Sequence, residues 1–309
     1  MIVYLELSSL CQLNCPFCRT GGQKQNYPQV PRGFMSKQTF TNSMIKIPHT
    51  SFIYFSNWGE PLLNKNVAWF CYEAVQKYGV TCQLDSNMQK LDEKMAEDIV
   101  RSGVQILQVS CDGASQETYE KYRVNCSLEK LVQNTKLIVK KRIELNIQTP
   151  NICFKMDVNK FNEHEISIFD RFAIESGADT SRVVGLCAMT PEGNQMFETF
   201  ASSDNKYDSR TRGSVTGCPA PNDRVAVDWD GEVYPCCNPS GLHIYSCGNI
   251  NTQTFSEIWH GQKYEYVRRF CIKGDIEHNG LAIPCYSCFG KYPDQEMKHN
   301  DPYAKFIKE

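Results

Sequence analysis

Strand and helix patterns alternate over the first 187 residues, and this alternation constrains the fold more than any other feature of the sequence. Apolar runs typical of buried strands lie at 3–7, 51–55, 80–84, 104–110, within 146–158 and at 181–187. A helical pattern follows each of the first five, with Ser36 as one predicted cap and Gly79 and Gly103 as predicted ends. Repeated strand–helix units predict parallel strands with functional loops at their carboxyl ends. Six strands are too few for a closed eight-stranded barrel, so we expect an α/β fold, a partial (β/α)6 barrel.

The pattern changes after the sixth predicted strand. Residues 188–217 are polar and contain Gly and Ser, which is typical of a linker. Residues 224–237 predict a β-hairpin that turns at Asp230-Gly231, and 254–259 and 262–270 predict short helices. We therefore expect a barrel domain over 1–187, a linker over 188–217 and a small second domain over 218–309.

The composition excludes several classes of protein. The chain of 309 residues has a net charge of −2, so no strong basic field would attract nucleic acid or anionic lipid. The lysine-rich run at 136–142 carries apolar residues at helical spacing and predicts a solvated helix face. The sequence has no signal segment and no apolar run of about 18 residues, so we expect a cytoplasmic protein. Sixteen cysteines in a reducing compartment favour metal or redox chemistry over disulfides.

Three cysteines, Cys11, Cys15 and Cys18, follow the first predicted strand. Thiolates are soft donors that suit zinc or iron–sulfur clusters. A structural zinc site is closed by four protein ligands, whereas three closely spaced thiolates fit a [4Fe–4S] cluster with one iron open to another ligand. The alternatives are a structural zinc knuckle and incidental core thiols.

The CxxxCxxC spacing, with Phe17 before the third cysteine, resembles the radical S-adenosylmethionine (SAM) superfamily. The resemblance implies that SAM chelates the open iron of a [4Fe–4S] cluster. It also implies that SAM is cleaved reductively to methionine and a 5′-deoxyadenosyl radical. Such a radical abstracts a hydrogen atom from an unactivated C–H bond of the substrate.

Further motifs follow the predicted strands in the order that the family shows. The sequence NWGEP at 57–61 is similar to the Gly-Gly-Glu element that binds the methionine ammonium, with Trp58 in place of the first glycine. DSN at 85–87 and SCDG at 110–113 resemble loops near the nucleoside and the ribose or carboxylate. Arg123 is predicted to meet the SAM carboxylate, with a surface salt bridge as the alternative. The resemblance thus implies SAM contacts from Phe17, Gly59, Glu60, Asn87, Ser110 and Arg123.

A second set of cysteines lies near the end of the chain. Their spacing resembles the start of the SPASM extension, truncated as in a twitch domain, because no cysteine follows the last of them. The resemblance implies one auxiliary [4Fe–4S] cluster held by Cys218, Cys236, Cys285 and Cys288. A four-cysteine zinc site is the alternative. Cys237 competes with Cys236, which the Gly-x4-Cys spacing favours, and most other cysteines, Cys271 among them, are predicted as core residues.

Two enzyme hypotheses follow from the resemblance. The chain begins at its first predicted strand, without a module for a leader peptide, which favours a small polar substrate such as a sugar or aminocyclitol. Its oxidation would use the auxiliary cluster as electron acceptor. The alternative is a peptide-modifying maturase or an epimerase, with Cys187 or Cys247 as hydrogen donor. Both need a flavodoxin- or ferredoxin-type electron donor. A ferredoxin-like electron carrier would explain the cysteines but not Glu60 or the barrel.

Overall fold

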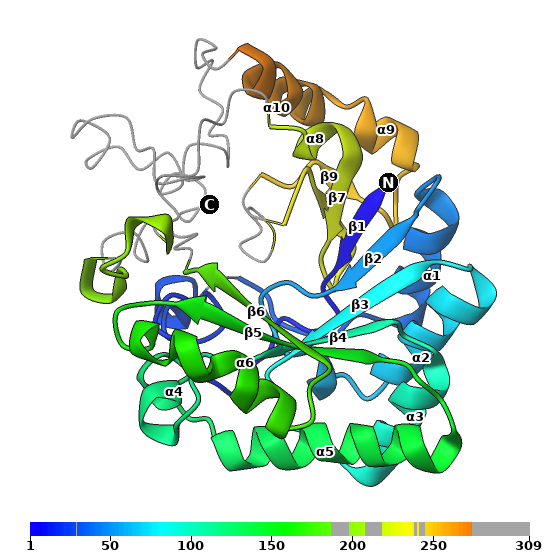
Figure 1. Ribbon diagram of the computed structural model, residues 1–309. Coiled ribbons are helices and arrows are strands. Elements are labelled where there is room, and N and C mark those ends of the chain that lie inside the picture. The colour runs from blue at the N-terminus through cyan, green and yellow to red at the C-terminus, as the bar shows by residue number, and fades with distance from the viewer. Residues whose placement is uncertain (29, 187–197, 208–217, 238–239, 241–244, 274–309) are drawn as a thin grey trace.

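The computed structural model describes residues 1–28, 30–186, 198–207, 218–237, 240 and 245–273 (Figure 1). The described strands form one sheet in the order β6-β5-β4-β3-β2-β1-β7-β8-β9. The first six are parallel, namely β1 (Ile2–Leu5), β2 (Phe52–Phe55), β3 (Thr81–Ser86), β4 (Ile106–Ser110), β5 (Asn151–Val158) and β6 (Thr180–Gly185). The sheet does not close, which confirms the predicted α/β fold with a partial barrel.

Helices cover the outer face of the curved sheet (Figure 1). They are α1 (Lys37–Lys46), α2 (Val67–Tyr72), α3 (Glu93–Ser102), α4 (Gln116–Tyr122), α5 (Leu128–Leu145) and α6 (Ile166–Glu175). The predicted cap is present, because the Ser36 side chain accepts a hydrogen bond from the Thr39 amide. Gly79 and Gly103 follow their helices with φ of 66° and 78°, a region that favours glycine.

The two faces of the parallel strands differ in chemistry. Residues such as Leu5, Phe55 and Leu84 point outward and are fully buried in the core under the helices. Their neighbours along each strand point into the barrel, because side chains alternate with a period of two. Several of these inward residues are polar, for example Gln83 and Gln108. The barrel interior is therefore a polar space rather than an apolar core.

The second part of the chain extends the same sheet. Strand β7 (Arg224–Val227) pairs in parallel with β1, and β8 (Glu232–Tyr234) and β9 (Gly248–Asn249) continue antiparallel. The predicted hairpin turns at Gly231, where φ is 95°. The helices α8 (Ala220–Asp223), α9 (Phe255–Trp259) and α10 (Gln262–Lys273) lie beside this hairpin (Figure 1). The boundaries of the two predicted domains stay a prediction.

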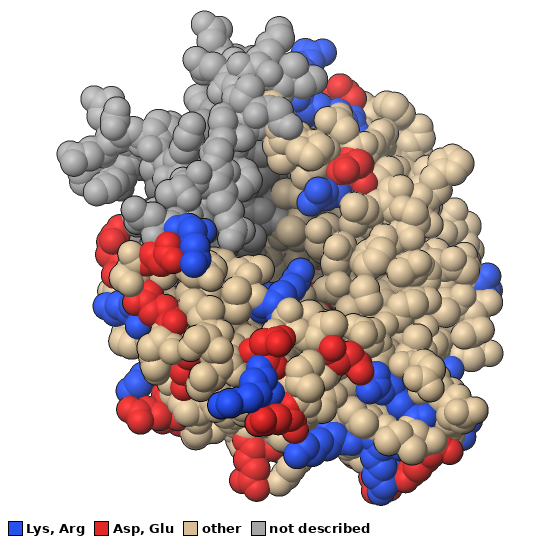
Figure 2. All heavy atoms as spheres, viewed as in Figure 1, with Lys and Arg blue, Asp and Glu red and all other residues tan. Residues whose placement is uncertain are grey.

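Basic and acidic side chains are intermixed over the lower half of the face shown in Figure 2, without a large area of one sign. No helix in the described part of the chain is long and apolar enough to cross a membrane.

Candidate active site

The three cysteines of the first cluster line one cavity of about 310 Å³ at the carboxyl ends of the barrel strands. Their loop is held by its own backbone, since the amides of Cys18 and Gly22 donate to the Cys15 carbonyl at 3.1 and 2.9 Å. Burial raises the pKa values of Cys11 and Cys15 to about 12. Neutral buried thiols of this kind lose their protons when they bind a metal, so the donor set fits an iron–sulfur cluster.

Glu60 lies buried beside these thiols, at the end of the loop that follows β2. One carboxylate oxygen accepts hydrogen bonds from Ser86 Oγ at 2.8 Å and from the Leu62 amide at 3.0 Å. The other accepts from the Asn87 amide at 2.8 Å. Burial raises the pKa of Glu60 to about 7, although these hydrogen bonds and Arg123 oppose the rise. Glu60 thus changes its charge near neutral pH, at the wall of the cavity.

Gly59 is required by a close approach of two loops. A Cβ atom at this position would lie 1.8 Å from the carbonyl oxygen of Ser8, in the loop that leads to Cys11. The next residue, Glu60, donates its amide to the Leu10 carbonyl at 2.8 Å. The glycine that was predicted to lie near the ligand therefore brings the Glu60 loop against the cysteine loop.

Trp58 stands where the family motif has its first glycine. The Arg19 guanidinium carbon lies 3.9 Å from the centroid of the Trp58 ring, a cation–π contact. The Trp58 carbonyl accepts hydrogen bonds from Thr20 Oγ1 at 2.6 Å and from Cys18 Sγ at 3.6 Å. The substituted residue thus joins the same two loops that meet at Gly59.

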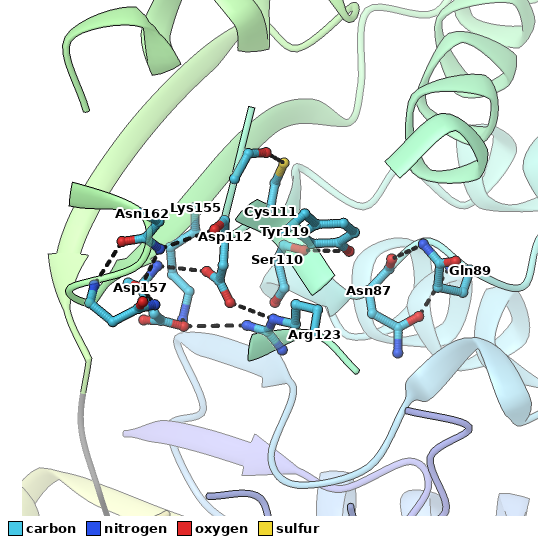
Figure 3. A network of polar contacts seen from close by, with 12 residues as sticks. Asn87, Gln89, Ser110, Cys111, Asp112, Tyr119, Arg123, Lys155, Asp157 and Asn162 are labelled. Carbon is cyan, nitrogen blue, oxygen red and sulfur yellow. Dashed lines mark hydrogen bonds and ion pairs between the residues drawn. The ribbon is translucent and has the colours of Figure 1, made fainter. Parts of the chain in front are cut away.

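Arg123 belongs to a buried network of charges (Figure 3). Its Nε lies 2.5 Å from Asp112 Oδ2, and its Nη2 lies 3.3 Å from Asp157 Oδ2. Lys155 Nζ lies 3.0 Å from the same Asp157 oxygen. Asp112 is fully buried, and the Arg123 side chain is 15% exposed. Arg123 is therefore held at the cavity wall by two carboxylates and is not part of a surface salt bridge.

The structure places the other predicted SAM contacts on the same cavity. Asn87 Nδ2 lies 3.6 Å from Cys11 Sγ, and Asn87 Oδ1 accepts from Gln12 at 2.8 Å. Phe17 is buried and packs edge-on against Tyr122 and Phe200. Ser110 lines the cavity.

The described cysteines of the second cluster point in different directions. Cys237 lines the cavity. Burial raises the pKa of Tyr4, and the nearby Cys237 raises it further. The neighbouring Cys236 instead adds to the raised pKa of Tyr264 in α10, after the larger effects of burial and Cys247. Cys218 forms a side-chain hydrogen bond with Cys271, a neighbour that was predicted to be a core residue.

Three of the predicted cysteines lie outside the described residues. They are Cys285 and Cys288, the other predicted ligands, and the candidate hydrogen donor Cys187. Cys247 is described, packs against the core and lies 3.9 Å from the Tyr245 carbonyl, and it is not among the residues that line the cavity.

The barrel strands supply a polar wall to the cavity that was not predicted from the sequence. This wall is formed by Tyr4, Ser56, Asp85, Gln108 and Lys155. Gln83 Nε2 donates to Asp85 Oδ1 at 2.7 Å, and burial raises the pKa of Asp85 against hydrogen bonds from Ser56 and Gln83. The signal was present as polar residues at every second position of β3, β4 and β5.

Comparison with known families identifies the class of protein. The sequence profile of the radical SAM superfamily matches residues 5–155, and the SPASM profile, an iron-sulfur cluster-binding domain, matches residues 218–289. The chain therefore belongs to the radical SAM superfamily and carries a SPASM domain. It is a radical SAM enzyme that uses SAM, a [4Fe–4S] cluster and an auxiliary iron–sulfur cluster.

Two characterised relatives match nearly the whole chain. The tungsten-containing aldehyde ferredoxin oxidoreductase cofactor-modifying protein of Pyrococcus furiosus is 25% identical, over 97% of this chain and 92% of the relative. The AdoMet-dependent heme synthase of Methanosarcina barkeri is 27% identical, over 96% of this chain and 95% of the relative.

Solved structures share the fold. The structure of anSMEcpe with bound AdoMet has a TM-score of 0.68 at 16% identity and covers 99% of this chain and 96% of its own. BtrN in complex with AdoMet and 2-DOIA has a TM-score of 0.53 at 17% identity, over 92% and 90% of the two chains. Streptococcus suis SuiB bound to precursor peptide SuiA has a TM-score of 0.62 at 12% identity, over 87% of this chain and 66% of SuiB.

Proposed function

We propose that this enzyme oxidises a small polar substrate, such as a sugar or aminocyclitol, by hydrogen abstraction from a C–H bond. The polar wall of the cavity carries this proposal, because its side chains line the same cavity as the three cysteines. Hydroxyl and amino groups of a substrate need such partners, since a buried polar group without a hydrogen bond costs about 1 to 3 kcal/mol. The likeness to BtrN, whose structure holds AdoMet together with 2-DOIA, supports a substrate of small size.

The first cluster would be held by Cys11, Cys15 and Cys18, which all line the cavity. When bound, this cluster supplies the electron that cleaves SAM. Glu60 is the proposed acceptor for the SAM amino group, and Arg123 the proposed donor to its carboxylate. The cavity positions of Asn87, Ser110 and Phe17 fit contacts with the nucleoside part of SAM.

The oxidation removes two electrons and two protons from a secondary alcohol. When bound, SAM would supply the acceptor for one hydrogen atom from carbon and the auxiliary cluster the acceptor for the second electron, while the hydroxyl proton would leave to a base on the cavity wall. Cys236 is the proposed ligand of that cluster on the β7–β8 hairpin, because the Gly-x4-Cys spacing favours it and Cys237 lines the cavity instead. The ligand roles of Cys218, Cys285 and Cys288 are proposed on their spacing alone.

The test is anaerobic turnover of the reduced enzyme with a panel of sugars and aminocyclitols, followed by mass spectrometry. We expect a product two mass units lighter than its substrate, in proportion to 5′-deoxyadenosine. Cys236→Ala should lose this product but still form 5′-deoxyadenosine. Steady product formation by Cys236→Ala would exclude Cys236 as a required ligand, and no oxidised product from any member would overturn the substrate class.

A second candidate function is favoured by the position of Cys237. A thiol on the cavity wall is placed to return a hydrogen atom to a substrate radical, which gives a redox-neutral epimerisation. The likeness to SuiB bound to its precursor peptide allows a peptide as substrate. In deuterium oxide, an epimerised product would carry deuterium at the inverted carbon, and Cys237→Ala would remove this label. Under the oxidation proposed above, we expect no such label.

A further inference from the structure

A second cavity, of about 370 Å³, opens on the outside of the barrel rim. Its apolar lining consists of three leucines and a methionine, of which Leu63, Leu91 and Met95 are partly exposed. Around them stand three exposed lysines, Lys65, Lys90 and Lys130. An apolar floor with a charged rim is the usual composition of a protein-binding surface.

The three lysines form a local positive charge on a chain whose net charge is −2. Among the described residues none of the three has an ion-pair partner, whereas Lys94 on the neighbouring helix pairs with Asp98 at 2.7 Å. Asp92 is the one acidic residue in the described lining, and its carboxylate is already engaged as the cap of α3, 2.8 Å from the Met95 amide. The lysines are therefore available to carboxylates of a partner.

The lining of this cavity is hydrogen-bonded to that of the active site at two places, since the amides of Leu62 and Gln89 donate to the side chains of Glu60 and Asn87 at 3.0 and 3.1 Å. One side follows directly from Glu60 through the short helical turn Pro61–Leu63. The other side contains Gln89, which is hydrogen-bonded to Asn87 (Figure 3). Asn87 Nδ2 in turn lies 3.6 Å from Cys11 Sγ. Gln89 also donates to the Ser127 carbonyl at 2.9 Å, which fixes this loop against the start of α5. Hydrogen bonds from Gln89 to Asn87 and from Asn87 to Cys11 thus connect the basic cavity with the first cysteine.

We propose that this basic cavity docks an acidic electron-carrier protein that reduces the first cluster; the inference rests on the proposed function. The partner is a small protein with carboxylates around an exposed flavin edge or iron–sulfur centre. In the transfer, the reduced carrier loses one electron and the oxidised [4Fe–4S]2+ cluster gains it as [4Fe–4S]1+, without a new covalent bond. The carrier approaches the cysteines from outside, while SAM and substrate occupy the inner cavity.

The test uses the reconstituted enzyme and two probes, a bacterial flavodoxin and a bacterial ferredoxin. Binding of each oxidised carrier is measured by calorimetry at low ionic strength, and 5′-deoxyadenosine formation is measured with the reduced carrier or with dithionite. For Lys90→Glu/Lys130→Glu we expect binding of the preferred carrier to weaken about tenfold or more, with a smaller dependence on salt. Dithionite-driven formation should stay unchanged, because a small reductant needs no docking surface.

The matched control is Lys37→Glu/Lys136→Glu, which makes the same charge change at exposed lysines of α1 and α5 away from the cavity. We expect it to bind the carrier like the parent, and Lys90→Gln/Lys130→Gln to show a smaller loss in the same direction. Equal losses in the control, or parent-like binding by Lys90→Glu/Lys130→Glu, would overturn the docking site. So would a parent enzyme that binds neither carrier. Failure of the parent with dithionite would instead count against the proposed function, since binding is measured separately.

Discussion

The buried carboxyl group of Glu60 should make SAM binding depend on pH near neutrality. Its pKa is raised to about 7, chiefly by burial. The ionised form can accept from the Asn87 amide and Ser86 Oγ, as in the structure, and also from the SAM amino group under the proposed contact. With this pKa the ionised fraction falls from about nine tenths at pH 8 to about one tenth at pH 6. The dissociation constant of SAM should therefore rise about tenfold, or about 1.4 kcal/mol, over these two pH units.

The raised pKa of Glu60 has the opposite pH dependence in its effect on the stability of the SAM-free chain. Because the pKa of Glu60 is higher in the folded than in the unfolded state, its contribution to stability is present below about pH 4.5. That contribution is lost as the pH rises through about 7. Binding of SAM thus strengthens over the range in which the contribution of Glu60 to the stability of the free chain weakens.

Equilibrium dialysis of radiolabelled SAM against the reconstituted enzyme, between pH 6 and 8, measures this effect. Glu60→Gln provides the reference, because the ratio of the two dissociation constants at each pH cancels the titration of SAM itself. We expect Glu60→Gln to bind more weakly at pH 8 and to lack the tenfold change. Equal SAM affinities at pH 6 and 8 in the parent, or the same pH profile in both proteins, would refute this role of Glu60.

Three further substitutions test the site. Cys15→Ala should abolish 5′-deoxyadenosine formation, because two thiols cannot hold the first cluster; nucleoside above a protein-free blank, measured by chromatography, would contradict this. Gly59→Ala should weaken SAM binding at least about tenfold without unfolding the chain, since its Cβ would lie 1.8 Å from the Ser8 carbonyl oxygen; parent-like affinity with a parent-like circular dichroism spectrum would show that the loop can yield. Asp112→Asn should lower the free energy of unfolding by about 3 kcal/mol, because it removes one partner of the buried ion pair with Arg123; a loss below about 1 kcal/mol in urea unfolding would show that Asp157 alone compensates the guanidinium.

The barrel could be predicted from the sequence because its units are local. Each strand is followed within a few residues by its helix, and caps such as Ser36 and turns such as Gly103 are read from neighbouring residues. The pairing of β7 with β1 could not be predicted in this way. Residues 224–227 show a strand pattern, but their parallel partner lies more than two hundred residues earlier, and no local signal fixes that register. The sequence therefore predicts the hairpin as part of a second domain, and the structure adds that its strands continue the barrel sheet.

In the candidate site, too, the residues of local motifs could be predicted, whereas those brought together from distant positions could not. Its cysteines and Glu60 could be found because motif spacing carries the information, and the structure gathers them on one cavity. The two carboxylates beside Arg123 could not, since Asp112 precedes it by 11 residues and Asp157 follows it by 34. The polar residues on the inner faces of the strands were also missed, because alternation alone does not distinguish a polar barrel interior from a solvated face.

The charges around the cavity indicate which ligands it accommodates. Asp112 and Asp157 face Arg123 and Lys155, so the network balances two negative charges with two positive ones before any ligand binds. With the contacts proposed above, the zwitterionic amino acid group of SAM would place its amino group at Glu60 and its carboxylate at Arg123 without adding net charge. A strongly anionic substrate would have to draw Lys155 away from Asp157, whose carboxylate would then keep only its 3.3 Å contact with Arg123, and weakening a buried ion pair in this way is costly. A neutral, hydrogen-bonding substrate avoids this cost, and the polar wall formed by Tyr4, Ser56, Asp85, Gln108 and Lys155 offers it donors and acceptors. The ion pairs of the barrel interior therefore favour the same class of substrate as its polar wall does.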